Sequence, residues 1–241
     1  MDGAARQSGR RGQVDGYGVN MDKALLQEED SPETLVQTTT DVIREKIVSR
    51  QLRGGASLNE RRLSEQLGLS RTPVRAALRQ LEGEGLLGRE GRTVFVRTIT
   101  FEEVMQILAV RLVLEIEAVR LAIGRFEPAL IAEIRKELLA MTDSASVGND
   151  KHWEIDDKLH LGIARASGND LLHGMIMGLR MRTRMFGTKR IPMRFEPGRQ
   201  EHLTLLDAIG AGDSERAIAA MRAHLTNTRD SIVAAVQGGT L

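Results

Sequence analysis

Cysteine is absent from this chain of 241 residues, which excludes disulfide bonds and metal sites built on thiolates. No apolar run approaches the roughly 20 residues that a membrane-spanning helix needs. The N-terminus also has no hydrophobic core of a signal peptide. These absences predict a cytoplasmic protein without membrane contact, and a reducing compartment is compatible with the lack of cysteine.

The remaining composition is that of a globular protein, with 28% charged and 41% hydrophobic residues. The length allows two modest domains, each large enough to bury a core. The net charge of +1 is unevenly distributed: residues 34–98 carry 12 Lys and Arg against 7 Asp and Glu, whereas residues 99–241 carry 18 against 19. A basic module beside a near-neutral one indicates a protein that contacts phosphates with one half only.

Residues 1–32 are rich in glycine and charge and show no apolar period, so we expect a disordered leader. A DNA-contacting arm around Arg10 and Arg11 is the alternative for this segment. The order of elements in residues 33–98 is that of a winged helix-turn-helix. The expected elements are helices at 34–51, 59–67 and 71–84, followed by a hairpin with strands at 86–90 and 93–97.

A stripe of arginines marks the third expected helix. Arg71, Arg75 and Arg79 are four residues apart and therefore share one face. This helix follows a tight turn at Gly68–Ser70, as a recognition helix does before entering the major groove. Arg61 and Arg62 are placed to bind DNA phosphates. The hairpin tip is placed to reach a flanking groove of the DNA. The candidate DNA-binding residues are Arg61, Arg62, Arg71, Thr72, Arg75, Arg79, Gly91 and Arg92. An ordinary solvated basic face is the alternative.

The stretch Leu58–Leu87, which contains the pieces SRTPVR and LEGEGLL, resembles the GntR family of bacterial regulators. The resemblance implies that Arg61, Arg71 and Arg75 contact DNA and that Gly91 lies at the tip of the wing. Glu90 departs from the basic or small polar residue that often precedes this glycine.

Residues 99–241 are expected to be all-helical, with a capping box at Thr100–Glu103. Their breaks divide them into helices at about 101–124, 128–142, 150–167, 170–187, 197–211 and 214–236. Six helices in this length predict a compact bundle. The expected fold class is therefore mainly α, a winged helix-turn-helix followed by an all-α six-helix bundle.

Histidines on three of these helices are candidates for a metal site. Asp156 and His160 share one helix face, while His202 and His224 lie among apolar neighbours and should point inward. Three imidazoles and one carboxylate suit Zn²⁺, and also Ni²⁺, Co²⁺ or Mn²⁺. Asp157 could replace Asp156 as the ligand. Scattered core histidines without a metal are the alternative.

The C-terminal half resembles the FCD effector domain of the FadR/VanR-like branch. The matching pieces are Asp156–His160, Ala166–Asn169, Glu201–Leu203 and Gly212–Leu225. The resemblance implies a divalent metal held by Asp156, His160, His202 and His224, and a small carboxylic acid as effector. Arg111 and Asn169 are the candidate effector-binding residues, with Arg180, Arg182 and Arg184 as further arginines. A surface pair of Arg111 with Glu115 is the alternative for Arg111.

Together these features predict a ligand-responsive regulator that binds a palindromic operator as a homodimer and represses until its effector binds. In one alternative the metal ion is itself the signal, and in another it is structural. A metal site of this composition can also activate water, so a metalloenzyme is a third alternative. The sequence offers no convincing general base beside the site, which argues against an enzyme. An enzyme would also not need a winged helix.

Overall fold

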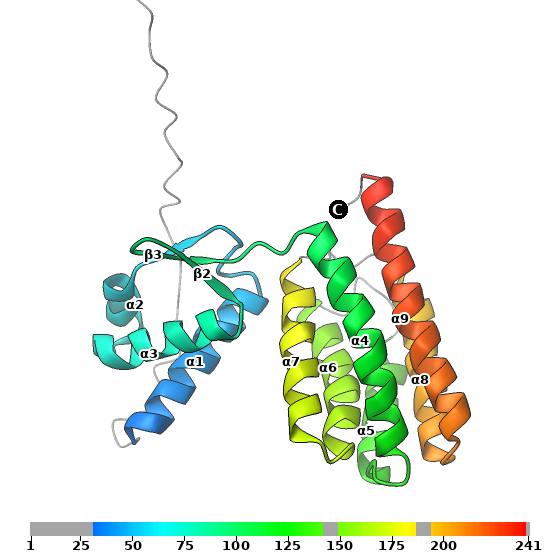
Figure 1. The fold of residues 1–241 in the computed structure, drawn as a ribbon. Coiled ribbons are helices and arrows are strands. Elements are labelled where there is room, and N and C mark those ends of the chain that lie inside the picture. Colours follow the sequence, from blue (N-terminus) through cyan, green and yellow to red (C-terminus); the bar gives the residue numbers. More distant parts are fainter. Residues whose placement is uncertain (1–30, 142–148, 187–193, 240–241) are drawn as a thin grey trace, which may run out of the picture.

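The computed structural model describes residues 31–141, 149–186 and 194–239, and these are mainly helical with one small antiparallel sheet (Figure 1). Two large groups of buried apolar side chains form separate cores, one within residues 43–96 and the other within residues 118–225. The expected mainly α fold class is confirmed. Nearly all of the expected leader lies outside the described residues.

The N-terminal part contains three helices, α1 (Pro32–Val48), α2 (Glu60–Leu67) and α3 (Arg71–Gly83). Asn59 begins α2 by accepting a hydrogen bond from the Arg62 N–H at 3.0 Å. Gly68 ends it in a left-handed conformation, with φ of 67°, which turns the chain sharply into α3. Ser70 occupies the N-cap position of α3, but its side chain makes no capping hydrogen bond.

A three-stranded sheet completes this part, in the order β1–β3–β2. Strands β2 (Leu87–Glu90) and β3 (Thr93–Val96) form the expected hairpin, closed around Gly91 with φ of 58°. The third strand, β1 (Ser57–Leu58), pairs with β3 and was not expected. Two residues are too short to show an alternating apolar pattern, so the sequence carried no signal for this strand.

The C-terminal part is a bundle of six described helices. Their bounds are α4 (Phe101–Ala122), α5 (Pro128–Ala140), α6 (Asn149–Ala166), α7 (Asp170–Met185), α8 (Phe195–Gly210) and α9 (Ser214–Gln237). Within the described ranges, no helix is both long and apolar enough to cross a membrane. Helix α4 packs against α6, α7 and α9, and it lies between α7 and α9 on one side of the bundle (Figure 1).

The capping box expected at the start of α4 forms only in part. Thr100 accepts a hydrogen bond from the Glu103 N–H at 3.1 Å. The Glu103 side chain does not return to Thr100 but binds Arg97, at 3.1 Å, and Arg182 of α7. Hydrogen bonds from two guanidinium groups are charge-assisted, so they are stronger than one hydrogen bond from a backbone N–H, and the Glu103 carboxylate turns to them.

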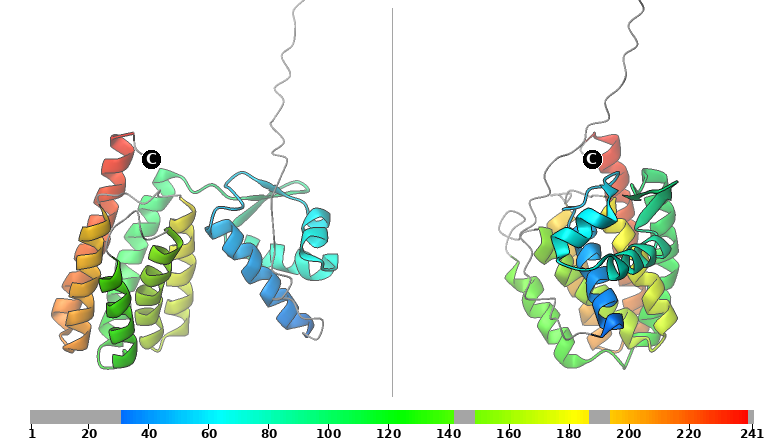
Figure 2. Two further views of the ribbon diagram at one scale, coloured as in Figure 1. Left: turned by 180° about the vertical axis from the view of Figure 1, so that it is seen from behind. Right: turned by 90° about the vertical axis from the view of Figure 1, so that its left-hand side faces the viewer.

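The two parts meet where α1 lies beside α7 (Figure 2). Met181 and Met185 of α7 pack against the N-terminal core. The Arg182–Glu103–Arg97 group lies near the same junction, at the connection between β3 and α4. Helix α7 therefore contacts the N-terminal part with these side chains while also belonging to the bundle.

Candidate DNA-reading face and metal centre

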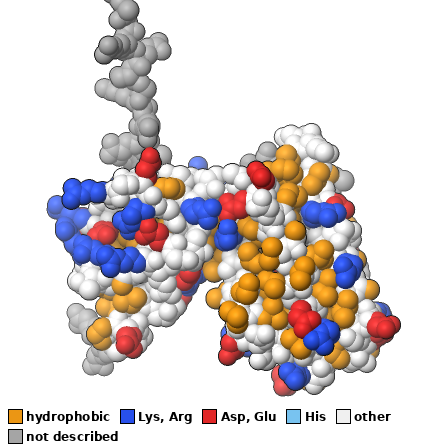
Figure 3. Space-filling model, viewed as in Figure 1, with side chains coloured by type: hydrophobic (Ala, Val, Ile, Leu, Met, Phe, Trp, Pro, Cys, Tyr) orange, Lys and Arg blue, Asp and Glu red, His pale blue; other side chains and the backbone are white. Residues whose placement is uncertain are grey.

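The eight predicted DNA-binding residues are exposed, and Figure 3 shows a concentration of Lys and Arg on the N-terminal part. An open groove runs between α2, α3 and the hairpin. Six predicted residues line it: Arg61, Arg71, Arg75, Arg79, Gly91 and Arg92. Arg62 and Thr72 are exposed but lie outside its lining. Arg89 also lines the groove. It lies on β2, outside the helical stripe of arginines, so it was not predicted from the sequence.

Acidic partners hold several of these arginines in place. Arg75 donates to Glu60 through Nε and Nη2, at 3.0 and 2.9 Å. Arg61 binds Glu65 at 2.8 Å on the same helix. Both pairs are solvent-exposed, and exposed ion pairs contribute little stability. These guanidinium groups can therefore exchange a carboxylate for a phosphate or a base edge at small cost.

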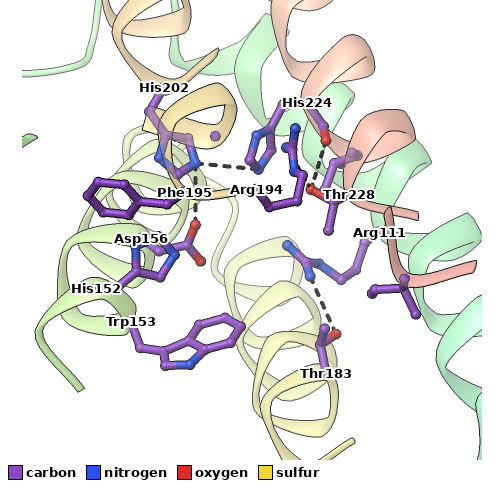
Figure 4. A pocket seen from close by; sticks show the side chains of 13 residues that line it. Arg111, His152, Trp153, Asp156, Thr183, Arg194, Phe195, His202, His224 and Thr228 are labelled. Atoms are coloured by element: carbon purple, nitrogen blue, oxygen red, sulfur yellow. Dashed lines mark hydrogen bonds and ion pairs between the residues drawn. The ribbon is translucent and has the colours of Figure 1, made fainter. Parts of the chain in front are cut away.

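Four predicted metal ligands from three helices converge inside the bundle. Asp156 and His160 come from α6, His202 from α8 and His224 from α9, and their donor atoms all lie within 4.8 Å of one another. His202 Nε2 is 3.3 Å from Asp156 Oδ1 and 3.4 Å from His224 Nε2 (Figure 4). His160 Nε2 is 3.7 Å from Asp156 Oδ1. Donors that bind one ion at about 2.0–2.2 Å lie about 3–4 Å apart in either tetrahedral or octahedral coordination, so these spacings fit.

Neighbouring carboxylates orient two of the histidines. His160 Nδ1 is bound to Glu115, and His224 Nδ1 lies 2.9 Å from Glu201 Oε2. Metal-ligating histidines usually donate their second ring nitrogen to a carboxylate in this way. His160 Nε2 is buried and has no hydrogen-bond partner among the described residues. A buried polar atom without a partner is costly unless something binds it, and a cation would satisfy this one.

The protonation states also suit a divalent cation. Burial lowers the pKa of His160, and Arg180 acts in the same direction. Burial, followed by the neighbouring His202, lowers the pKa of His224 to about 3. Burial alone would raise the pKa of Asp156, but Arg180 and the histidines outweigh it and hold this pKa well below its usual range. Near neutral pH, His160 and His224 are therefore neutral donors and Asp156 is an anion, as metal binding requires.

A cavity of about 110 Å³ adjoins this cluster. Asp156, His202 and His224 line it together with Arg111, and Trp153 and Phe195 give it apolar walls (Figure 4). Arg111 is 4% exposed; its Nε donates to Glu115 at 2.7 Å and its Nη1 lies 3.4 Å from the Thr183 hydroxyl. The pair with Glu115 therefore exists, but it is buried at the cavity instead of lying on the surface.

The other predicted effector-binding residue lies elsewhere. Asn169 is exposed, and its side chain caps α7 by accepting from the Leu172 N–H at 3.0 Å. It is not among the residues that line the cavity. Among the three further arginines, Arg180 binds Asp156 and Asp157, Arg182 binds Glu103, and Arg184 binds Asp157 at 3.2 Å.

Sequence reasoning missed the residues that support the cluster. Glu115 and Glu201 hold histidines, and Arg180 binds the second carboxylate oxygen of Asp156. Glu201 adjoins His202 in the sequence, yet it contacts His224 on another helix. One sequence signal could have indicated them: these charged residues lie on helix faces that the bundle must bury, so each needs a buried partner.

Family models match both parts of the chain. Residues 35–96 match the family described as bacterial regulatory proteins, gntR family, and residues 106–227 match the FCD domain. The chain belongs to the GntR family. The resemblance drawn from the sequence is thereby confirmed, and the molecule is a DNA-binding transcriptional regulator of the GntR type with an FCD domain.

Individual relatives agree with this assignment. A regulatory protein of Escherichia coli (strain K12) named for the L-lactate dehydrogenase operon is 30% identical over 227 residues, covering 81% of this chain and 85% of its own. The Nta operon transcriptional regulator of Aminobacter aminovorans is 27% identical and covers 79% of this chain and 91% of its own. The solved structure of E. coli McbR/YncC shares the fold, with a TM-score of 0.72 at 24% identity over 85% of this chain and 98% of its own. The metalloenzyme alternative is therefore set aside, because the relatives are regulators.

Proposed function

We propose that this GntR-type regulator binds a palindromic operator as a homodimer and represses until a small carboxylic acid binds beside a divalent metal ion. Residues 33–98 form the DNA-binding domain in this proposal. Residues 99–241 form the domain for effector binding and dimerisation. The metal is expected to be Zn²⁺, with Ni²⁺, Co²⁺ or Mn²⁺ as alternatives, since all four accept imidazole and carboxylate ligands.

One observation carries the effector proposal: three of the four metal ligands, Asp156, His202 and His224, line the same cavity as Arg111. An octahedral ion with four protein ligands has positions left for a carboxylate oxygen. The Arg111 guanidinium can bind the same acid with charge-assisted hydrogen bonds. A single water needs about 10–15 Å³ of such space, so a cavity of about 110 Å³ suits an acid of a few carbon atoms. Trp153 and Phe195 would cover its apolar part.

The name of the E. coli relative guides the first choice of probe. L-Lactate, a 2-hydroxy acid, is the substrate named in the operon of that regulator. Such an acid offers a carboxylate for Arg111 and a neighbouring hydroxyl for the ion. Small 2-hydroxy carboxylates are therefore the first class to test.

On the DNA side, we assign Arg71, Arg75 and Arg79 of α3 to base edges, where arginine recognises guanine bidentately. Arg61, Arg62 and Thr72 are assigned to phosphates, which position the domain without reading sequence. Gly91 and Arg92 at the hairpin tip are assigned to a flanking groove. The exposure of all eight residues, six of which line one groove, supports this assignment.

An exposed apolar face on α4 and α7 supports the homodimer. Val113 is 68% exposed and Val110 45% on α4, while Leu171 is 75% and Met175 47% exposed on α7. Figure 3 shows hydrophobic side chains covering much of this side of the bundle. Contiguous apolar surface of this kind marks an interaction site. A two-fold dimer formed through it would present two α3 helices to two half-sites.

The test combines thermal stability with operator binding. Metal-loaded protein is screened against small organic acids beginning with L-lactate, with His202→Ala as the control. A stabilising acid that releases operator DNA from wild type, and has no effect on His202→Ala, supports the proposal. A shift in stability and DNA affinity from metal alone favours the ion as the signal. Equal affinity of wild type for operator and scrambled DNA would refute sequence-specific regulation.

A further inference from the structure

Glu115 connects the candidate metal centre to the arginine of the effector cavity. It lies on α4 one helical turn after Arg111, and its side chain is 2% exposed. Its Oε1 accepts from Arg111 Nε at 2.7 Å, and its Oε2 binds His160 Nδ1. A guanidinium can only donate hydrogen bonds, so the oxygen that faces Arg111 is an acceptor, and close contacts with two basic side chains are those of a carboxylate.

This contact determines where His160 carries its hydrogen. An ionised carboxylate can only accept hydrogen bonds, so His160 Nδ1 must be the donor. A neutral imidazole has a single N–H, and therefore Nε2 is left with a free lone pair. That nitrogen is the one that faces Asp156 Oδ1 at 3.7 Å and has no hydrogen-bond partner in the described part of the chain.

We propose that Glu115 is a positioning residue of the metal centre: it holds His160 in the tautomer whose Nε2 can bind the ion, while its other oxygen holds Arg111 at the cavity wall. This inference rests on the proposed function, because it concerns the same metal. It adds that one buried carboxylate serves both the metal ligand and the effector-binding arginine.

Glu115→Gln tests this role with little change in shape. The amide oxygen can still accept from Arg111, but the amide nitrogen is a donor and then faces His160 Nδ1. His160 must respond by moving its hydrogen to Nε2, which blocks the ligand atom. Removing such an outer partner typically costs 10–100-fold in metal affinity, and we expect a loss at or above about 10-fold.

Zinc titration by calorimetry measures the effect on the full-length protein. The matched control is Glu117→Gln on the same helix, whose carboxylate binds Arg120 at the surface. It should leave Zn²⁺ affinity unchanged. A second readout is the ¹⁵N spectrum of the imidazoles without metal. His160 should be protonated on Nδ1 in wild type and on Nε2 in Glu115→Gln, a change that a merely structural role would not produce.

A second variant, Arg111→Met/Glu115→Gln, covers the case in which Glu115→Gln does not fold because it leaves the buried Arg111 charge without its anion. Replacing both members of a buried ion pair is usually better tolerated than removing one. Arg111→Met/Glu115→Gln should therefore fold, and it should bind Zn²⁺ at least about 10-fold more weakly than Glu117→Gln does.

The outcomes separate this inference from the proposed function. Wild type that binds no Zn²⁺, Ni²⁺, Co²⁺ or Mn²⁺ would refute the metal centre itself. Wild type that binds Zn²⁺, with equal affinity in both Glu115 variants and an unchanged His160 tautomer, would overturn the role of Glu115 and leave the metal centre standing.

Discussion

Arg75 is bound to Glu60 in the free protein, and this pair must open before the guanidinium can reach a base edge. Two substitutions therefore act in opposite directions. Arg75→Ala removes the base-reading guanidinium and should weaken operator binding. Glu60→Gln removes the competing carboxylate, and also a negative charge from the face that meets phosphates, so it should tighten binding.

The expected magnitudes differ for the two variants. A bidentate arginine–guanine pair distinguishes the right base from a wrong one by about 5- to 150-fold. A symmetric dimer has two such pairs, so Arg75→Ala should cost about 25-fold at least. The Arg75–Glu60 pair is exposed, with side chains 52% and 30% accessible. Breaking a pair of this kind costs little, so Glu60→Gln should gain up to about five-fold per half-site.

Fluorescence anisotropy with operator and scrambled duplexes, measured across a salt series, checks both effects. Arg75→Ala should lower the ratio of operator to scrambled affinity. Arg61→Ala should instead weaken binding to both duplexes by the same factor. It should also reduce the slope of log affinity against log salt concentration by about 0.9 for each phosphate that is no longer neutralised. Arg120→Ala, on the bundle, is the control and should change nothing. If Arg75→Ala weakens both duplexes by one common factor, or Glu60→Gln weakens binding, the assignment of Arg75 as a base reader is wrong.

Three further predictions concern the bundle. Leu159→Ala, at a position that is 0% exposed, should cost about 2–5 kcal/mol by chemical denaturation, and a loss below about 1 kcal/mol would contradict close packing around α6. Val113→Asp should shift the protein from dimer to monomer in light scattering, whereas Leu139→Asp on α5, 57% exposed, should not; the same behaviour of both would exclude the α4–α7 face as the interface. Glu201→Gln should lower Zn²⁺ affinity about 10- to 100-fold by calorimetry, because Glu201 holds His224, and an unchanged affinity would show that this carboxylate does not support the metal.

Local signals were sufficient for the helices and the hairpin. Asn59 and Gly68 mark the ends of α2, and the apolar stripe beside Arg71, Arg75 and Arg79 defines the buried side of α3. Helix caps, glycine turns and a period of 3.6 residues depend on neighbours within a few positions, so they can be read without the fold. The resemblance to the GntR family and its FCD domain then favoured a metal site over scattered core histidines, with Asp156 as its carboxylate.

By itself, the sequence determined the order of the helices and the hairpin and the family, and it predicted the four donor residues. The tertiary structure alone decided how their surroundings are arranged. Glu115 meets His160 from 45 positions away, and Arg180 meets Asp156 from 24 positions away. The tertiary structure also places Arg111 on the cavity wall, and Asn169 at a helix cap outside the cavity. Such contacts depend on how α4, α6 and α7 rotate and pack against one another, and packing of several helices is not encoded in the spacing of residues along any one of them.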